Sequence, residues 1–263
     1  MKKRLSHFFL FMFCFFYAGF SMANSTKLAS GFNAPTGIAF DSSGVMYVTN
    51  WSGDSIVKVR ENGEHETVYT GISSPAGIVI DKQDNIYVSS YSDDYILKIT
   101  PNGQSQKISE GYQTPTGISF SNDGRLLVTN RSTGEIVSLD LDTKQKTIVA
   151  RGLNTPVGVT QLADNSLVVS QYSGRLTMIE PNGNKTELGD QFEVPGVGIA
   201  TISSNVVAVI DNGAGMLRQI DVKTKKVTNL ASSLSGAVAL AYYKNNYYVG
   251  TWGDGSVYMV DGK

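Results

Sequence analysis

Cysteine is almost absent from the sequence: the 263 residues include a single one, Cys14, in an apolar run near the N-terminus. Residues 24–263 contain no thiol, which excludes disulfide bonds, zinc–thiolate sites and thiol catalysis in that part of the chain. Histidine is nearly as rare, because residues 24–263 contain only His65. General acid–base chemistry near neutral pH would therefore need a different side chain.

Long apolar runs are also missing, since the longest covers only residues 8–18. As a helix it would rise about 16 Å, whereas a membrane span needs roughly 20 residues. It follows a basic start at residues 2–4 and precedes the small residues Ser21 and Ala23. These are the parts of a secretory signal peptide of bacterial type. We therefore expect cleavage after residues 1–23, no stable membrane anchor, and an exported protein that is periplasmic or secreted.

Charge of one sign accumulates nowhere in the chain. Removing the three basic residues of the predicted signal from 22 basic and 23 acidic residues leaves 19 − 23 = −4. A mildly acidic protein without a basic run is a poor partner for nucleic acid, so none is expected. Proline is scarce, with 7 residues, and glycine is plentiful, with 27, which favours many short strands joined by tight turns.

A phrase built on proline and glycine recurs along the chain. The prolines lie at residues 35, 75, 115, 156 and 195, so the period is 39 to 41 residues. Four copies have the form Pro-x-Gly followed by an apolar residue, and two looser copies follow, the last without proline. The copies are Ala34-Pro35-Thr36-Gly37-Ile38, Ser74-Pro75-Ala76-Gly77-Ile78, Thr114-Pro115-Thr116-Gly117-Ile118, Thr155-Pro156-Val157-Gly158-Val159, Val194-Pro195-Gly196-Val197-Gly198-Ile199 and Ser235-Gly236-Ala237-Val238-Ala239-Leu240.

Each copy continues with a turn, a second strand, a polar loop, a third strand, another turn and a fourth strand. Four antiparallel strands in about 40 residues form one blade of a β-propeller. The sequence thus predicts an all-β, six-bladed β-propeller with four-stranded antiparallel blades, as a single domain over residues 24–263. Its blades are expected to start near residues 32, 72, 112, 153, 192 and 234. No segment has a sustained 3.6-residue period, so helices are not expected.

The last repeat ends at Lys263 after its third strand and lacks a fourth. Residues 26–31 match the fourth strands of the other copies and directly precede the first Pro-x-Gly phrase. We therefore expect the N-terminal strand, at about residues 26–31, to complete blade six and close the ring. Closure removes the exposed strand edges of an open array.

The phrase Pro-Thr-Gly-Ile-Ala-Phe-Asp at residues 35–41, continued at residues 44–50 and 56–59, closely resembles the NHL repeat. The resemblance covers nearly all of residues 24–263. It implies the superfold of SMP-30/gluconolactonase-like enzymes, strictosidine synthase-like proteins, paraoxonases, amidating lyases and, with one blade more, streptogramin lyases. Because this superfold supports several functions, a site has to be inferred from individual positions.

In SMP-30-like enzymes, the residue between the proline and the glycine is a metal-binding Asp or Asn. The residues that correspond to it here are uncharged: Thr36, Ala76, Thr116, Val157, Gly196 or Val197, and Ala237. A divalent metal needs several oxygen ligands, usually with carboxylates among them, so we expect no metal site and no cofactor. Thr36 and Thr116 are candidates to donate a hydroxyl group to a ligand, although local hydrogen bonding is the simpler explanation.

The loops between the second and third strands face the same end of the channel. Their first residues are polar, and we assign Asn50, Asn130 and Gln171 as candidate ligand contacts, against the alternative that they cap the loops. The second residues of these loops are Trp51, Tyr91, Arg131, Tyr172, Asn212 and Trp252.

Aromatic rings with a polar edge, placed on rigid strand ends, make good recognition surfaces for peptides, sugars and flat ligands. Because blades six, one and two are neighbours, we expect Trp252, Trp51 and Tyr91 to form one aromatic arc. Arg131 suits a carboxylate or a phosphate. The alternative is that the rings lean outward and cover neighbouring blades.

Two functions remain open at this stage. The first is a recognition module, expected to be a monomer, that binds a small molecule, peptide, glycan or partner protein at the aromatic end. The second is a lyase, hydrolase or cyclase that resembles streptogramin lyases or strictosidine synthases, with Asp211 as base and Glu193 nearby. The missing metal ligands and histidine favour the first, so the enzyme is the alternative.

Overall fold

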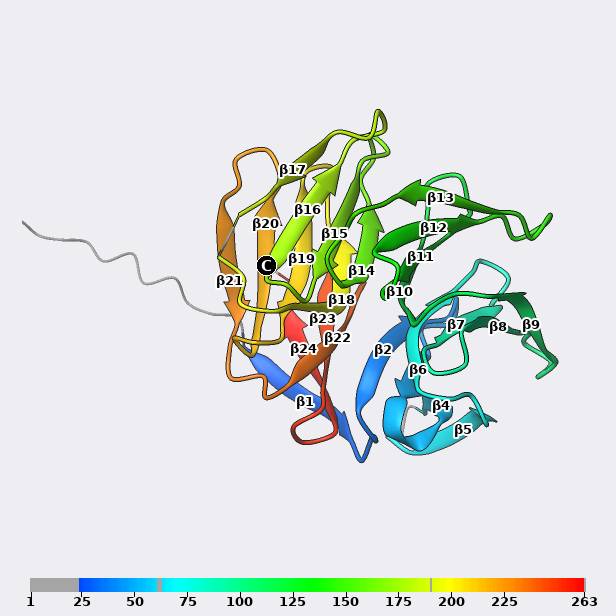
Figure 1. Ribbon diagram of the computed structural model, residues 1–263. Coiled ribbons are helices and arrows are strands. Elements are labelled where there is room, and N and C mark those ends of the chain that lie inside the picture. Colours follow the sequence, from blue (N-terminus) through cyan, green and yellow to red (C-terminus); the bar gives the residue numbers. More distant parts are fainter. Residues whose placement is uncertain (1–23, 61–62, 190, 263) are drawn as a thin grey trace, which may run out of the picture.

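The computed structural model describes residues 24–60, 63–189 and 191–262, so the predicted signal peptide lies outside the described residues. The all-β architecture is confirmed: six four-stranded antiparallel sheets are arranged as a propeller (Figure 1). The one helical segment among the described residues is the single-turn 3-10 helix η1 (Trp51–Gly53). No helix in these ranges is long and apolar enough to cross a membrane.

The first three blades follow one another along the chain, each from the inner to the outer strand. Blade one contains β2 (Pro35–Phe40), β3 (Met46–Asn50), β4 (Ser55–Val59) and β5 (His65–Thr70). Blade two contains β6 (Pro75–Ile80), β7 (Ile86–Ser90), β8 (Tyr95–Ile99) and β9 (Ser105–Glu110). Blade three contains β10 (Pro115–Phe120), β11 (Leu126–Asn130), β12 (Glu135–Leu139) and β13 (Lys146–Ala150).

The next two blades repeat this order, and the last one uses both ends of the chain. Blade four contains β14 (Pro156–Gln161), β15 (Leu167–Gln171), β16 (Arg175–Ile179) and the short β17 (Lys185–Glu187). Blade five contains β18 (Pro195–Thr201), β19 (Val206–Asp211), β20 (Met216–Asp221) and β21 (Val227–Ala231). Blade six contains β22 (Ala237–Tyr243), β23 (Asn246–Thr251), β24 (Ser256–Asp261) and, as its outer strand, β1 (Ser25–Ser30).

Ring closure by the N-terminal strand is confirmed. Strand β1 pairs with β24 in antiparallel register, with Thr26 opposite Met259 and Lys27 opposite Tyr258. The Lys27 ammonium also lies 2.7 Å from the Asp254 carboxylate in the preceding loop. Both ends of the described chain are thus held in one sheet.

The glycine of each Pro-x-Gly phrase is required by the close approach of neighbouring inner strands. A Cβ atom at Gly37 would lie 2.6 Å from the carbonyl oxygen of Ala76 in the next blade. The same Ala76 oxygen accepts a 2.8 Å hydrogen bond from the buried hydroxyl of Thr49. Ser89 repeats this bridge by donating to the Thr116 carbonyl oxygen at 2.5 Å. The inner strands therefore pack too tightly around the channel for a side chain at this position.

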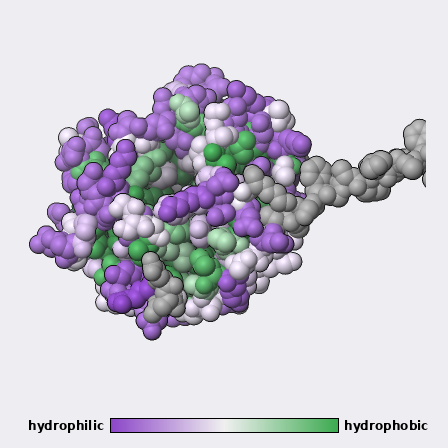
Figure 2. Space-filling view, turned by 180° about the vertical axis from the view of Figure 1, so that it is seen from behind, coloured by the Kyte–Doolittle hydropathy of each residue, from purple (hydrophilic) through white to green (hydrophobic). Residues whose placement is uncertain are grey.

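Apolar side chains fill the spaces between adjacent blades. Hydrophilic residues cover much of the face shown in Figure 2, with hydrophobic patches between them. In blades one and two, the second residue of the second strand is a tyrosine that packs against the next blade: Tyr47 and Tyr87. Their hydroxyls donate to Asp41 and Asp81 at 3.3 and 3.0 Å. Burial, with the nearby Asp41 carboxylate, raises the pKa of Tyr47 to about 12. Tyrosine and aspartate thus close these blade interfaces.

Candidate functional site

One end of the propeller holds a cavity of about 120 Å³, which we call the aromatic pocket. It lies where the loops between the second and third strands meet the start of the inner strands. It is lined by Thr36, Trp51, Tyr91, Thr116, Arg131, Val157, Tyr172, Val197, Val238 and Trp252. The residues predicted from the second loop position therefore come together here, except Asn212.

A regular backbone hydrogen bond places these loop residues. The Trp51 amide donates to the Ala34 carbonyl oxygen at 3.1 Å, and the Tyr172 amide donates to Thr155 at 3.1 Å. The acceptors precede the proline and have a left-handed backbone, with φ of 54° at Ala34 and 51° at Thr155. The corresponding bonds in the other blades are Tyr91 to Ser74, Arg131 to Thr114, Asn212 to Val194 and Trp252 to Gly236. Because the backbone repeats, the second loop residue starts from the same place in every blade.

The base of the aromatic pocket is apolar. Val157, Val197 and Val238 are buried and form a small cluster, with Tyr172 packed against it. Val238 takes the position that the sequence comparison gave to Ala237. The sixth copy lacks the proline that marks the register, so the alignment is one residue off. In the sequence, aligning Val238-Ala239-Leu240 with Val197-Gly198-Ile199 would have corrected it, and in the structure Leu240 lies against Gly198.

The expected aromatic arc is present. The ring centroids of Trp51 and Tyr91 are 4.6 Å apart, and those of Trp51 and Trp252 are 6.0 Å apart. Trp252 is 43% exposed although it is a large apolar side chain. The arc therefore forms one side of the aromatic pocket and extends to its open edge.

Arg131 is the one charged residue that lines the aromatic pocket. Its guanidinium lies 5.8 Å from the ring centroid of Tyr91 and 5.4 Å from that of Tyr172. Its Nη1 donates to the Tyr91 hydroxyl, while its Nε is buried and has no hydrogen-bond acceptor. Burial raises the pKa of Tyr172, although the charge of Arg131 opposes the shift. Tyr172 thus stays neutral beside the arginine.

Thr36 and Thr116 line the aromatic pocket, but their hydroxyls make local bonds. Thr36 donates to the Ala34 carbonyl oxygen at 3.0 Å, and Thr116 donates to Thr114 at 3.1 Å. Both residues are buried. Their hydroxyl oxygens remain available as acceptors, so they contribute polarity to a mainly apolar wall.

The polar residues predicted from the first loop position do not line the aromatic pocket. Asn50, Asn130 and Gln171 are buried, and each accepts a hydrogen bond from a backbone amide of the preceding inner loop. The distances are 3.2 Å from Asn33, 2.6 Å from Gln113 and 2.6 Å from Asn154. These side chains therefore hold two loops of one blade together, which is the capping alternative.

Asp211 is the blade-five member of this set and is fully buried. It accepts hydrogen bonds from the amides of Glu193 and Val194, at 3.1 and 2.9 Å, and pairs with Arg218 at 3.1 Å. Glu193 itself is exposed, and Asn212 donates to the Ala237 carbonyl oxygen at 2.7 Å. None of these three lines the aromatic pocket. The geometry thus gives Asp211 a structural role.

Metal-ligating side chains do not gather in the described part of the chain. Residues 24–60, 63–189 and 191–262 contain no group of three or more His, Cys, Asp or Glu residues that could hold an ion. His65 lies on the outer strand β5, where its ring stacks on Phe32 with centroids 4.3 Å apart. It is therefore remote from the channel, on the outer part of its blade.

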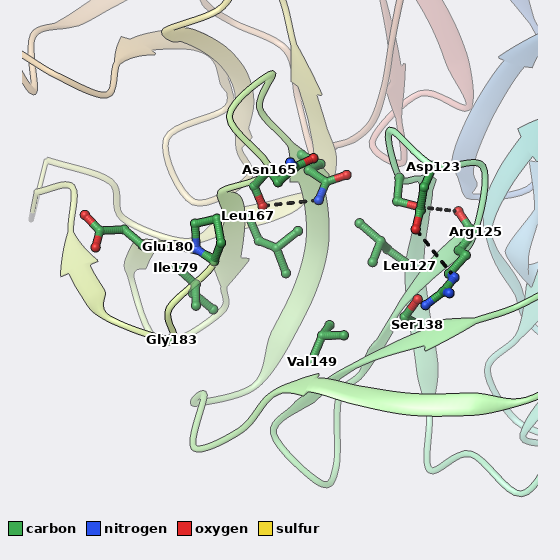
Figure 3. A pocket seen from close by; sticks show the side chains of 13 residues that line it. Asp123, Arg125, Leu127, Ser138, Val149, Asn165, Leu167, Ile179, Glu180 and Gly183 are labelled. Carbon is green, nitrogen blue, oxygen red and sulfur yellow. Dashed lines mark hydrogen bonds and ion pairs between the residues drawn. The ribbon is translucent and has the colours of Figure 1, made fainter.

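A larger cavity of about 240 Å³ lies between blades three and four, and we call it the blade 3–4 groove (Figure 3). Leu127 and Ser138 stand here where blade two has Tyr87 and Lys98, and Gln161 replaces the aromatic residue seen at Phe120. The smaller side chains leave the interface open. Its further lining residues are Ser121, Asp123, Arg125, Val149, Asn165, Leu167, Ile179, Glu180, Pro181 and Gly183. We did not predict this groove, although comparing these positions across repeats would have indicated it.

No family model and no curated protein sequence matches the chain. Solved structures of similar fold include a gluconolactonase from Xanthomonas campestris, with a TM-score of 0.80, 14% identity, and coverage of 91% of this chain and 89% of that chain. A catalytically inactive virginiamycin B lyase from Staphylococcus aureus with quinupristin, in which a histidine is replaced by alanine, has a TM-score of 0.65 at 16% identity and coverage of 89% and 82%.

A chain of the nidogen/laminin complex has a TM-score of 0.69 at 22% identity, with coverage of 78% of this chain and 84% of that chain. At such identities the similarity shows the fold alone, which is shared by enzymes and by a protein from a binding complex. The chain thus has the six-bladed β-propeller fold.

Proposed function

We propose that this protein is a recognition module that binds a small molecule, or a small group projecting from a peptide, glycan or partner protein, in the aromatic pocket. The observation that carries the proposal is the convergence of the second loop positions. Every blade except blade five contributes an aromatic ring or a guanidinium to one edge, above a base of three valines. A concave apolar site with few polar groups is the usual form of a small-ligand site.

The size of the aromatic pocket limits what it accepts. Its volume of about 120 Å³ is below the several hundred Å³ typical of sites for larger ligands. An engineered apolar cavity of about 150 Å³ holds a benzene molecule. The aromatic pocket thus suits one ring or one short hydrocarbon chain, and the partly exposed Trp252 extends the contact surface outward.

An enzyme that uses Asp211 as its base is the alternative, and its support is weaker. Its basis is that similar structures include a lyase and a gluconolactonase. The virginiamycin B lyase with a histidine replaced by alanine is described as inactive, whereas His65 of this chain lies on an outer strand. The carboxylate of Asp211 pairs with Arg218 and accepts hydrogen bonds from two backbone amides, so it is poorly placed to act as a base. A similar structure from the nidogen/laminin complex fits a role in recognition better.

We further propose that the protein is an exported monomer of the NHL type, found in the periplasm or secreted. The support is the signal-like sequence of residues 1–23 and the repeated Pro-x-Gly phrase. N-terminal sequencing of the protein recovered from its native host would test export, with Asn24 as the expected first residue. Recovery of chains that begin at Met1 would contradict it.

The chain contains its own probe for binding, because its two tryptophans, Trp51 and Trp252, both line the aromatic pocket. We expect a saturable change of tryptophan fluorescence with at least one member of a panel of small aromatic acids and amides, monosaccharides and dipeptides. Trp51→Ala should weaken binding about tenfold or more, since central aromatic contacts dominate such sites. In this variant, the fluorescence of Trp252 still responds to binding.

The control is Ile148→Ala, which removes an exposed apolar side chain from β13, away from the aromatic pocket. Its affinity should equal that of the unmodified protein. A panel that leaves the fluorescence unchanged throughout would contradict the proposal, as would equal affinity in the Trp51→Ala variant.

A further inference from the structure

The charge of Arg131 is not balanced by any carboxylate among the described residues. Most other arginines of the propeller have such a partner within 4 Å. These are Arg60 with Glu66, Arg125 with Asp123 and Asp140, Arg151 with Glu135, and Arg218 with Asp211. Arg175 has no carboxylate partner either, but it is exposed to solvent, whereas Arg131 is half-buried. Arg131 is thus the one described arginine that is both partly desolvated and unpaired.

The groups around Arg131 satisfy its guanidinium only in part. Two tyrosine faces contribute cation–π attraction, and the Tyr91 hydroxyl accepts one hydrogen bond. A guanidinium has five N–H donors, and the buried Nε lacks an acceptor. The Nε of Arg218 is also without an acceptor, but there Asp211 balances the charge. A partly buried cation with an unsatisfied donor is stabilised when an anion binds beside it.

The remaining walls of the aromatic pocket restrict which anion fits. Val157, Val197 and Val238 offer no hydrogen bonds, and the rings of Trp51 and Trp252 add apolar surface. An ion such as inorganic phosphate would lose its hydration against these walls without finding enough donors. A carboxylate needs fewer donors, and its two oxygens match the planar fork of a guanidinium. An apolar body attached to it would cover the valines.

From this combination we propose that the ligand of the aromatic pocket is a small organic carboxylate. Its carboxylate binds the guanidinium of Arg131, and its compact body, a single ring or a short hydrocarbon chain, packs on Val157, Val197 and Val238 beside the aromatic arc. This inference rests on the proposed binding function and specifies the chemical class of its ligand. Tyr91 and Tyr172 act as positioning residues, because they hold the guanidinium between their rings.

The test compares acids with amides of the same shape. Benzoate, phenylacetate and hexanoate are titrated against benzamide, phenylacetamide and hexanamide, with binding followed by tryptophan fluorescence and by calorimetry. Each acid should bind about tenfold more tightly than its amide, because hydrogen bonds to ionised groups are about twice as strong as neutral ones. Arg131→Gln should abolish this preference, and Arg131→Lys should retain only part of it, since an ammonium group lacks the fork.

Arg125→Gln is the matched control, because it removes an arginine of the same blade whose charge is already paired. It should leave the preference for acids unchanged, and thermal unfolding of each variant confirms that it is folded. If acids and amides bind with equal affinity, the carboxylate assignment is wrong. If Trp51→Ala then weakens the binding of both, the proposed binding function still stands. If no acid binds, the carboxylate assignment is also wrong. If, in addition, no member of the wider panel changes the tryptophan fluorescence, the proposed binding function is wrong as well.

Discussion

Strand β11 has an arginine at each of its ends, and the two have opposite surroundings. Arg125 precedes the strand and lines the blade 3–4 groove beside Asp123 (Figure 3). Its Nε lies 3.5 Å from Asp123 and 3.8 Å from Asp140. Arg131 follows the strand and lines the aromatic pocket, where it meets tyrosines and no carboxylate. The groove is the larger cavity, at about 240 against 120 Å³.

We place the ligand in the smaller of the two cavities, on the basis of how well the protein's own groups are paired and not of volume. In the groove, Arg125 already pairs with Asp123 and Asp140, and Gln161 bonds to Asn122 and Asn165, so a ligand would have to compete with existing bonds. In the aromatic pocket, the protein leaves an incompletely paired cation among apolar walls. The free energy available to a ligand is larger where the protein's own groups are less well satisfied.

A third arginine, Arg218, provides the largest expected effect because its ion pair is buried. Its side chain is 12% exposed, and Asp211 is fully buried. Asp211→Asn leaves the arginine without its counter-charge, so we expect the free energy of unfolding to fall by about 3–5 kcal/mol. For a domain of this size, that lowers the melting temperature by roughly 10 °C, which calorimetry would measure.

The double variant Asp211→Asn with Arg218→Met separates the charge effect from the loss of hydrogen bonds. It should recover part of the stability, because no unpaired charge remains in the interior. A loss below about 1 kcal/mol in Asp211→Asn would mean that water screens this pair as it screens a surface pair. The ion pair of Arg218 would then contribute as little to the free energy of unfolding as the exposed pairs of Arg125.

The two arginines of β11 should differ in the sign of their effect on stability. Arg131→Met removes a partly buried cation whose Nε has no acceptor, so we expect the free energy of unfolding to rise by about 1 kcal/mol. Arg125→Met removes an exposed pair and should lower it by less than about 1 kcal/mol. Urea unfolding of both variants without added ligand measures the difference. A clear loss of stability in Arg131→Met would show that the tyrosine rings already balance the charge.

The fold was predictable because the features that determine it recur in at least five of the six repeats, and only the sixth has Ala239 in place of the glycine. Gly37 and its equivalents are required where neighbouring inner strands approach, so the glycine persists and marks the period. The sixth repeat has only three strands of its own, and this missing fourth strand predicted the pairing of β1 with β24. The lining of the aromatic pocket was predictable in large part, because a repeated backbone hydrogen bond sets the second loop residue of each blade.

The sequence was less informative about which partner each polar side chain contacts. Asn50, Asn130 and Gln171 are polar at the first loop position, but only the structure reveals that the backbone of a neighbouring loop uses them. The pairing of Asp211 with Arg218 joins residues on adjacent strands of blade five whose side-chain directions the repeat does not specify. The role of a polar side chain depends on its partner, which residue type and period do not encode.

The smallest expected effect comes from giving the blade 3–4 groove the residues that close the earlier interfaces. Leu127→Tyr with Ser121→Asp would reproduce the pairs Tyr47–Asp41 and Tyr87–Asp81. Filling the space with a bonded tyrosine should raise the free energy of unfolding by about 1 kcal/mol or less. Leu127→Tyr alone should gain less, because its hydroxyl would lack the aspartate acceptor. Urea unfolding compares the two variants, and a double variant less stable than the single one would contradict this explanation of the groove.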